Sequence, residues 1–295
     1  MSAPTRRIGS LDVSALGMGV MPVSQDRIPA VPHGQAIATV HAALDAGITF
    51  FDTADTFAPS WDTMGHNEKI VAEALRTWSG DASQVVVATK GGITRGAGER
   101  WGRDGSADYL RSALEKSLVN LETDAVDLYY WHRPDRSIRY AEGVQTLAAL
   151  REEGLIREIG ISNANLEEIE VAREVLGDGG LAAVQNQFSL TFFHTSREEL
   201  AHCGTHGIAF VPFSPLGGTG GGARGLGRRF PQVAQIAEAH GVSPQRVVLA
   251  WQLSLGDHVI PIPGAGRPAS ITDSAAAMTL RLSQDELDTI NEIIA

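Results

Sequence analysis

The stretch VDLYYWH (residues 126–132) is followed by a helical pattern over residues 141–151, by the pair Glu153-Gly154, and by IREIGIS (residues 156–162). The first and last segments are short and rich in β-branched and aromatic residues, which is typical of buried strands. The middle segment has apolar residues three and four positions apart, and a glycine after it can supply the left-handed exit of a helix. The stretch therefore predicts a strand, a crossover helix and a second, parallel strand.

The same alternation runs through the rest of the chain. Eight segments are predicted as strands: residues 13–20, 49–52, 85–90, 126–132, 156–162, 183–187, 208–214 and 259–263. Helical patterns lie between them at residues 35–46, 67–78, 107–121, 141–151, 166–176 and 196–202. Eight βα units in about 250 residues match the size of a TIM barrel, so we expect one (β/α)8 barrel domain over residues 1–295. A short β-hairpin at residues 7–13 is expected to close the barrel floor.

A doubly wound α/β sheet is the alternative architecture. It would need a glycine-rich phosphate-binding turn that opens a helix after the first strand. The segment after Gly19 instead continues into a run with three prolines, which favours the barrel. Two long irregular stretches, residues 93–106 and 216–229, would then lie at the carboxyl face of the barrel, where loops of this length are often functional.

Composition argues against several classes of protein. The chain carries 24 Lys plus Arg against 35 Asp plus Glu, a net charge of −11; nucleic acid and anionic membranes are therefore not expected as partners, because both bind clustered positive charge. The single cysteine, Cys203, cannot form an internal disulfide, and no Cys/His cluster has zinc spacing, so no metal is expected. The chain has no signal-peptide core and nothing near the ~18 apolar residues of a membrane span. We expect a cytoplasmic protein.

Polar residues end most of the predicted strands. Asp52 ends the second, Lys90 the third, His132 the fourth, Ser162-Asn163 the fifth and Gln185 the sixth. Taken alone, each such residue commonly caps a turn, pairs with a neighbour or bonds to a backbone carbonyl. In a barrel, however, they converge at the mouth. An aspartate, a lysine and a histidine without a partner nucleophile suit proton transfer to an oxygen better than hydrolysis or metal chemistry.

Further motifs accompany these strand ends. They are FFDTAD (residues 50–55), Asn67-Glu68, ATKG (88–91), DLY (127–129) with His132, GISN (160–163), VQN (184–186), PFSPL (212–216) and PIPG (261–264). In this order, and over residues 8–287, they resemble the aldo-keto reductases. The resemblance implies a TIM barrel that binds NADP(H) across its mouth and reduces an aldehyde or ketone to an alcohol by hydride transfer.

The resemblance also implies a catalytic set of an aspartate, a tyrosine, a lysine and a histidine. Asp52, Lys90 and His132 occupy three of these positions. The tyrosine position, five residues after the aspartate, holds Phe57. A phenyl ring keeps the volume of a phenol but has no proton for the developing alkoxide, and general acid catalysis is worth about 10²–10⁴ in rate.

Three explanations of Phe57 stay open. One is a deliberate Tyr→Phe replacement made to trap a substrate complex. Another is a natural variant in which His132 or His66 donates the proton, since imidazole titrates near neutrality. The third is loss of catalysis, which would leave a catalytically silent NADP(H)-binding scaffold or redox sensor.

The resemblance further implies contacts to the nicotinamide half of the cofactor. Ser162, Asn163 and Gln185 would hold the carboxamide, which determines the ring face that meets the substrate. Phe213 would stack on the nicotinamide ring, because an aromatic face there costs little entropy to hold flat.

The remaining cofactor contacts lie on later segments. The loop around the pyrophosphate is expected to include Ser214, Leu216 and Gly218, which would present backbone N–H groups. Arg267 is expected at the adenosine 2′-phosphate, with Ser270 where many relatives have a second arginine, and Asp273 near the adenine amino group. Met21 and Gly264 complete the expected cofactor contacts.

The substrate is expected to be a small carbonyl compound or alcohol. Trp61, Trp101 and Trp131 lie near strand ends or in the loops around the expected site. Aromatic walls would suit a bulky or cyclic carbonyl compound. Each tryptophan could equally do no more than pack a loop.

Overall fold

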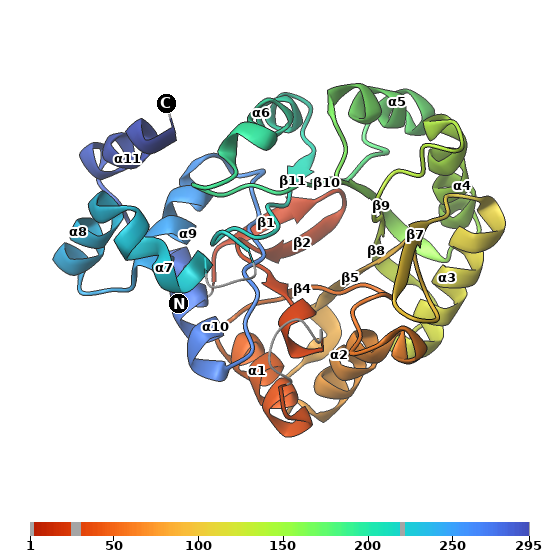
Figure 1. Ribbon diagram of the computed structural model, residues 1–295, viewed down its shortest axis with the longest axis horizontal. Helices are drawn as coiled ribbons and strands as arrows, with labels where there is room; N and C mark the ends of the chain where they lie inside the picture. Colours follow the sequence, from red (N-terminus) through yellow and green to blue (C-terminus); the bar gives the residue numbers. More distant parts are fainter. Residues whose placement is uncertain (1–2, 25–30, 219–221, 295) are drawn as a thin grey trace.

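The computed structural model describes residues 3–24, 31–218 and 222–294, and shows a curled sheet surrounded by helices (Figure 1). Seven strands of the described residues pair in parallel, in the spatial order β11 (Ala209–Phe210), β10 (Ala183–Gln185), β9 (Ile156–Ser162), β8 (Val126–Trp131), β5 (Val86–Gly91), β4 (Phe50–Asp52) and β3 (Met18–Gly19). Their carboxyl ends therefore meet at one face of the sheet. The predicted αβ alternation is confirmed.

Residues 258–264 close the barrel between the two outer strands of this sheet. The Phe210 amide donates to the His258 carbonyl at 2.7 Å, and the Gly19 amide donates to the Pro263 carbonyl at 3.2 Å. The segment was predicted as the eighth strand, but it pairs only through isolated bridges. Pro261 and Pro263 have no N–H to donate, so a regular ladder cannot form there. The (β/α)8 barrel is confirmed, with an irregular eighth member.

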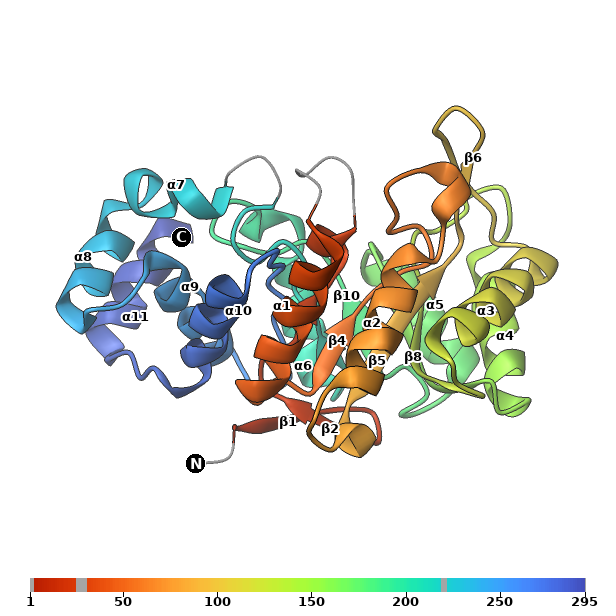
Figure 2. The ribbon, with the colours of Figure 1, turned by 90° about the horizontal axis from the view of Figure 1, so that it is seen from below.

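An antiparallel hairpin of β1 (Thr5–Ile8) and β2 (Leu11–Ser14) closes the floor of the barrel, as predicted. Ile8 and Val13 are fully buried and pack with the inward-facing strand residues. Figure 2 shows the hairpin at the end of the barrel opposite β6 (Ile93–Gly96). Hydrophobic side chains from the hairpin thus fill the end of the barrel that carries no strand-end polar groups.

The prediction of one strand over residues 13–20 is wrong. Residues 13 and 14 belong to β2 of the hairpin, and only Met18–Gly19 pairs with β4. The Ser14 side chain explains the break, because its hydroxyl donates to the Leu16 carbonyl at 2.7 Å and accepts from the Thr49 amide at 2.9 Å. These bonds turn the chain from the floor into the barrel wall.

The helices surround the sheet. They are α1 (His33–Asp45), α2 (His66–Thr77), α3 (Ala107–Leu121), α4 (Tyr140–Glu152), α5 (Leu166–Leu176), α6 (Arg197–Thr205), α7 (Gly222–Arg229), α8 (Pro231–His240), α9 (Pro244–Ser254), α10 (Pro268–Ala275) and α11 (Gln284–Asn291). The 3₁₀ turns are η1 (Met21–Val23), η2 (Trp61–Thr63), η3 (Ala82–Gln84), η4 (Phe193–Thr195), η5 (Ala276–Thr279) and η6 (Glu292–Ile294). No helix within the described ranges is both long and apolar enough to cross a membrane.

Both stretches that were predicted to be irregular contain regular structure. Residues 93–106 include an antiparallel hairpin of β6 and β7 (Arg100–Arg103). Residues 222–229 form α7, whereas residues 219–221 of the same stretch lie outside the described residues. Glycines made both segments look irregular in sequence. The β6–β7 hairpin stands out from the carboxyl face of the barrel (Figure 2).

Glu158 of β9 holds the floor hairpin through its turn. The carboxylate accepts from the Ser10 amide at 2.7 Å and from the Ser10 hydroxyl at 2.6 Å. We expect Glu158→Ala to lower the free energy of unfolding by about 1–3 kcal/mol, because it leaves a part-buried N–H without its acceptor. Denaturant unfolding checks this value. Glu158→Gln keeps an acceptor oxygen and should lose less; equal stability of Glu158→Ala and the unchanged protein would contradict the assignment.

Candidate active site

A buried ion pair lies at the carboxyl ends of β4 and β5. Lys90 Nζ donates to Asp52 Oδ1 at 2.5 Å and to the Thr53 carbonyl at 2.7 Å. Gln185, at the end of β10, donates to the other oxygen of Asp52 at 2.7 Å. Both charged side chains are almost completely shielded from water. Three strands therefore contribute to one polar network inside the mouth of the barrel.

Burial acts on both members of this pair. It raises the pKa of the Asp52 carboxyl and lowers the pKa of the Lys90 ammonium, because each charge has lost its water shell. The close contact between them opposes both shifts. The hydrogen bonds from Gln185 and to the Thr53 carbonyl occupy further polar positions of the pair, as a buried charge pair requires.

Phe57 lies between Lys90 and His132. Lys90 Nζ is 5.3 Å from the centroid of the Phe57 ring. The His132 ring meets the Phe57 ring edge-to-face, with 5.8 Å between centroids and an interplanar angle of 84°. Asp52, Phe57, Lys90 and His132, which the sequence analysis singled out, are thus brought together by the fold.

His132 follows β8 and is held by its backbone. Its amide donates to the Gly91 carbonyl at 2.9 Å, and its carbonyl accepts from Asn163 Nδ2 at 3.0 Å. Desolvation lowers the pKa of His132 well below its ordinary value, and the charges of Lys90 and Arg133 lower it further. The imidazole is therefore neutral near pH 7, able to hydrogen-bond but poorly suited to hold an extra proton.

Ser162, Asn163 and Gln185, which were expected to hold the nicotinamide carboxamide, lie beside the network of Asp52 and Lys90. The Asn163 amide donates to the Gln185 carbonyl at 3.0 Å, and Asn163 Nδ2 donates to the Ser162 hydroxyl at 3.0 Å. Asn163 has a φ of 59°, a left-handed conformation that asparagine tolerates better than most residues. The trio therefore forms a preorganised polar edge next to Asp52.

The segment from Phe213 to Gly218 follows β11 at the same face. The Phe213 amide donates to the Asn186 carbonyl at 3.0 Å, and half-buried Leu216 packs on the hydrophobic core. Ser214 has a φ of 54° and Gly218 a φ of 78°. A Cβ on Gly218 would lie 3.4 Å from Ser214 Oγ. That distance is an ordinary contact, so the left-handed backbone at position 218, rather than lack of space, is what favours glycine.

Met21 and Gly264 lie where β3 meets residues 258–264 and the barrel closes. Met21 is in η1, directly after β3, and Gly264 bridges to Gly19. A Cβ on Gly264 would lie only 2.7 Å from Cγ of the Pro22 ring, so the proline ring takes the space that a side chain at position 264 would need. Both residues lie near the carboxyl end of β3, and their contacts to a cofactor stay a prediction.

Arg267 and Asp273 lie at α10. Arg267 precedes the helix, is exposed, and donates to the Ser270 hydroxyl at 3.5 Å. Asp273 instead accepts from the Ser243 hydroxyl at 2.5 Å and from Arg246 Nη2 at 2.6 Å. Its carboxylate therefore ties α9 to α10, and its contact with an adenine remains a prediction.

Trp61 and Trp101 line an exposed rim near β6. They are 41% and 43% exposed. The Trp61 amide donates to Glu99 Oε1 at 2.9 Å, so η2 is bonded to the β6–β7 hairpin. The Arg95 guanidinium lies 4.7 Å from the centroid of a Trp101 ring.

Trp131 was expected to line the substrate pocket together with Trp61 and Trp101, but the structure places it elsewhere. It is 1% exposed, and its ring stacks on Tyr140 of α4 with centroids 4.9 Å apart. Successive side chains of a strand point to opposite faces, so Trp131 of β8 points outward while Tyr130 points into the barrel. Trp131 packs the layer between sheet and helices.

Two positioning residues were missed. Arg95 is buried and donates to the Ala58 carbonyl at 2.7 Å and the Pro59 carbonyl at 3.3 Å, which holds the loop after Phe57. Asn67 donates to the Val20 carbonyl at 2.9 Å and accepts from the Thr53 hydroxyl at 2.6 Å. For Asn67, the Asn67-Glu68 motif was a signal in the sequence. For Arg95, which lies in a glycine-rich stretch, the sequence offered no signal.

His66, one of the two histidines proposed as a substitute acid, lies at the start of α2. Its Nδ1 hydrogen-bonds to the Ser24 hydroxyl at 3.0 Å. Burial lowers the pKa of His66, and the charges of His33 and Lys69 act in the same direction. His132, in contrast, is the histidine in direct ring contact with Phe57.

Comparison with known proteins gives a consistent picture. The sequence model of the Aldo/keto reductase family matches residues 15–295. A probable aldo-keto reductase from Glycine max is 31% identical, over 96% of this chain and 86% of that protein. An uncharacterized oxidoreductase from Schizosaccharomyces pombe is 28% identical, over 98% of this chain and 90% of that protein.

Solved structures agree in fold. A glycerol dehydrogenase from Gluconobacter oxydans superposes with a TM-score of 0.83 at 24% identity, over 100% of this chain and 96% of that one. An aldo-keto reductase from Klebsiella pneumoniae, in complex with NADPH, has a TM-score of 0.80 at 26% identity, over 99% and 95%. Because the family model and the Glycine max relative both cover nearly the whole chain, this protein belongs to the aldo/keto reductase family.

Proposed function

We propose that this protein is an NADP(H)-dependent oxidoreductase for a small aldehyde or ketone, and that Phe57 leaves it without the usual proton donor. One observation carries the proposal. Lys90, which is paired with Asp52, lies over the ring of Phe57, and the His132 ring contacts the same ring. This arrangement provides charge and hydrogen bonding around one point, where a carbonyl oxygen would develop negative charge.

The residues around the mouth fit a nicotinamide nucleotide. The left-handed backbone at Ser214 and Gly218 suits a pyrophosphate, because backbone N–H groups in left-handed turns bind anions. Ser162, Asn163 and Gln185 would hold the carboxamide, and Phe213 would cover the nicotinamide ring. When bound, NADPH supplies the hydride that the carbonyl carbon accepts. The Klebsiella pneumoniae relative, which contains NADPH, supports this choice of cofactor.

The remaining residues act on the carbonyl oxygen. Neutral His132 would orient the oxygen by a hydrogen bond. The Lys90 ammonium would stabilise its developing charge, while Asp52 holds that ammonium in place. Phe57 fills the donor position with a ring that cannot release a proton. Carbonyl polarisation is therefore retained, and the proton transfer that completes the alcohol is impaired.

A catalytically silent NADP(H)-binding scaffold is the second candidate function, and Phe57 itself favours it. Incubation with NADPH and a panel of aldehydes and ketones, followed by cofactor absorbance, separates the two. Slow but saturable turnover supports an enzyme, whereas binding without turnover supports a scaffold. In either case we place the protein in a reducing cytoplasm, in keeping with its single, buried cysteine, Cys203.

Phe57→Tyr is expected to raise the rate of carbonyl reduction by at least ~10², the lower end for a recovered general acid. The restored phenol would lie beside the Lys90 ammonium, which lowers the pKa of the phenol and prepares it to release a proton. Steady-state kinetics with NADPH measure the gain. Cofactor affinity, followed by fluorescence, should change little because only one hydroxyl is added.

Two further variants test this interpretation. Lys90→Met in the Phe57→Tyr background should remove most of the gain, and Phe57→Leu alone should give none. An unchanged low rate in Phe57→Tyr would show that the catalytic geometry is lost and would favour the scaffold. If the protein with Phe57 already reduces carbonyl compounds rapidly, and His132→Ala abolishes that activity, His132 would instead be the substitute acid.

Arg267→Ala is expected to weaken NADPH binding more than NADH binding. Among the described residues, the exposed Arg267 guanidinium makes only a long hydrogen bond to Ser270, so it is available for the 2′-phosphate that distinguishes NADPH from NADH. Fluorescence titration of both nucleotides gives the ratio of affinities. Arg139→Ala removes another exposed cation, which precedes α4, and serves as the matched control. Equal losses for the two nucleotides would remove Arg267 from this role.

A further inference from the structure

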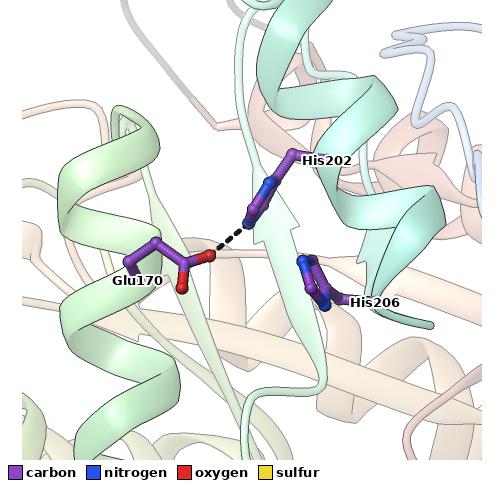
Figure 3. Close-up of side chains that lie close together, drawn as sticks. All are labelled: Glu170, His202 and His206. Atoms are coloured by element: carbon purple, nitrogen blue, oxygen red, sulfur yellow. Dashed lines mark hydrogen bonds and ion pairs between the residues drawn. The ribbon is translucent and has the colours of Figure 1, made fainter.

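Three side chains with metal-binding groups lie together outside the barrel mouth (Figure 3). Glu170 is on α5, His202 is on α6, and His206 directly follows α6. His202 Nε2 hydrogen-bonds to a carboxylate oxygen of Glu170, and the centroids of the two histidine rings are 4.4 Å apart. One ligand atom from each residue lies within 4.8 Å of the other two. The cluster shares no residue with the Asp52 network.

The positions of the residues make this cluster accessible and able to chelate. His202 and His206 are four residues apart, a spacing that places side chains on the same helical face. Glu170 reaches them from the neighbouring helix, and Figure 3 shows its carboxylate directed toward His202. Glu170 and His202 are half-buried and His206 is exposed. An ion could therefore enter from solvent and would join two helices.

The ligand set selects a class of metal. Two imidazoles and one carboxylate suit Zn²⁺ and its neighbours in the first transition series, whereas Ca²⁺ and Mg²⁺ prefer oxygen ligands. Zinc binds nitrogen at about 2.0–2.1 Å; His202 and Glu170 are already in contact, so the His206 nitrogen is the ligand atom that must approach. His206 lies past the end of its helix and can supply this movement by side-chain rotation.

Arg173 is the competing cation at this cluster. Its Nη1 lies 2.7 Å from both carboxylate oxygens of Glu170. A carboxylate has about four lone-pair positions, so one oxygen can accept from Arg173 and also bind a metal. The positive charge of Arg173 lowers the affinity of the cluster for a metal ion but removes none of its three ligands.

We propose that Glu170, His202 and His206 bind one Zn²⁺-class transition-metal ion, with water in the open position, and that the ion cross-links α5 to α6. The imidazoles bind as neutral lone-pair donors, so a metal displaces the hydrogen bond between His202 and Glu170. The site is separate from the reductase centre and does not depend on the function proposed above. A metal that binds only the folded chain also raises its thermal stability.

The test uses the tag-free full chain, treated with EDTA and dialysed, and titrated with ZnCl₂ by calorimetry. One equivalent should bind, the midpoint of thermal unfolding should rise with Zn²⁺, and EDTA should reverse the rise. His206→Ala, which changes an exposed side chain, should weaken binding at least ~10-fold, the loss typical of disturbed metal sites. Circular dichroism confirms that the variant is folded. Glu170→Gln should also weaken binding.

The matched control is His240→Ala. His240 also contacts a carboxylate, Glu286 at 2.7 Å, but this pair is not part of a three-ligand cluster among the described residues. The control should keep the one-equivalent binding and the thermal shift. Binding that is equal in His206→Ala and the unchanged chain, or is lost equally in His240→Ala, would indicate adventitious binding to surface histidines and overturn the proposal. The absence of saturable Zn²⁺ binding would also overturn it.

Discussion

The buried contact between Asp52 and Lys90 is the constraint on which the rest of the site depends. It joins β4 to β5, and the bond from Gln185 extends it to β10 on the other side of the mouth. A buried ion pair is tolerated only when its other polar positions are also satisfied, and loss of one partner leaves a charge at a cost of about 3–5 kcal/mol. The barrel must therefore close in one register for this network to form.

The same network explains why phenylalanine is accommodated at position 57. The Lys90 ammonium lies over its ring and the His132 ring meets it in a T-shaped arrangement, both favourable for an aromatic ring. Packing and electrostatics around the ring are thus retained, while the hydroxyl that would exchange a proton is missing. The stability of the site and its catalytic chemistry therefore depend on different parts of the side chain at position 57. Packing requires the ring, whereas proton transfer requires the phenol oxygen.

Loops and outer helices add what the barrel itself does not define. Arg95, on the projecting β6–β7 hairpin, holds the loop that follows Phe57 through backbone carbonyls, and the same hairpin presents Trp101 at the rim. Substrate selection would depend on such loops, since the strands supply only the polar centre. On the outer surface, Glu170 and His202 bring two helices into a contact that has no part in that centre.

The sequence by itself determined the barrel, the floor hairpin, the polar strand ends and Phe57, because periodicity and strand-end residues are local signals. The tertiary structure decided features that depend on partners distant in sequence. It divided residues 13–20 between hairpin and wall, turned Trp131 outward, and paired Asp273 with Arg246. It also brought Glu170 to His202 and His206, although no metal was expected from the sequence. Such contacts join separate elements, so packing rather than local pattern selects them.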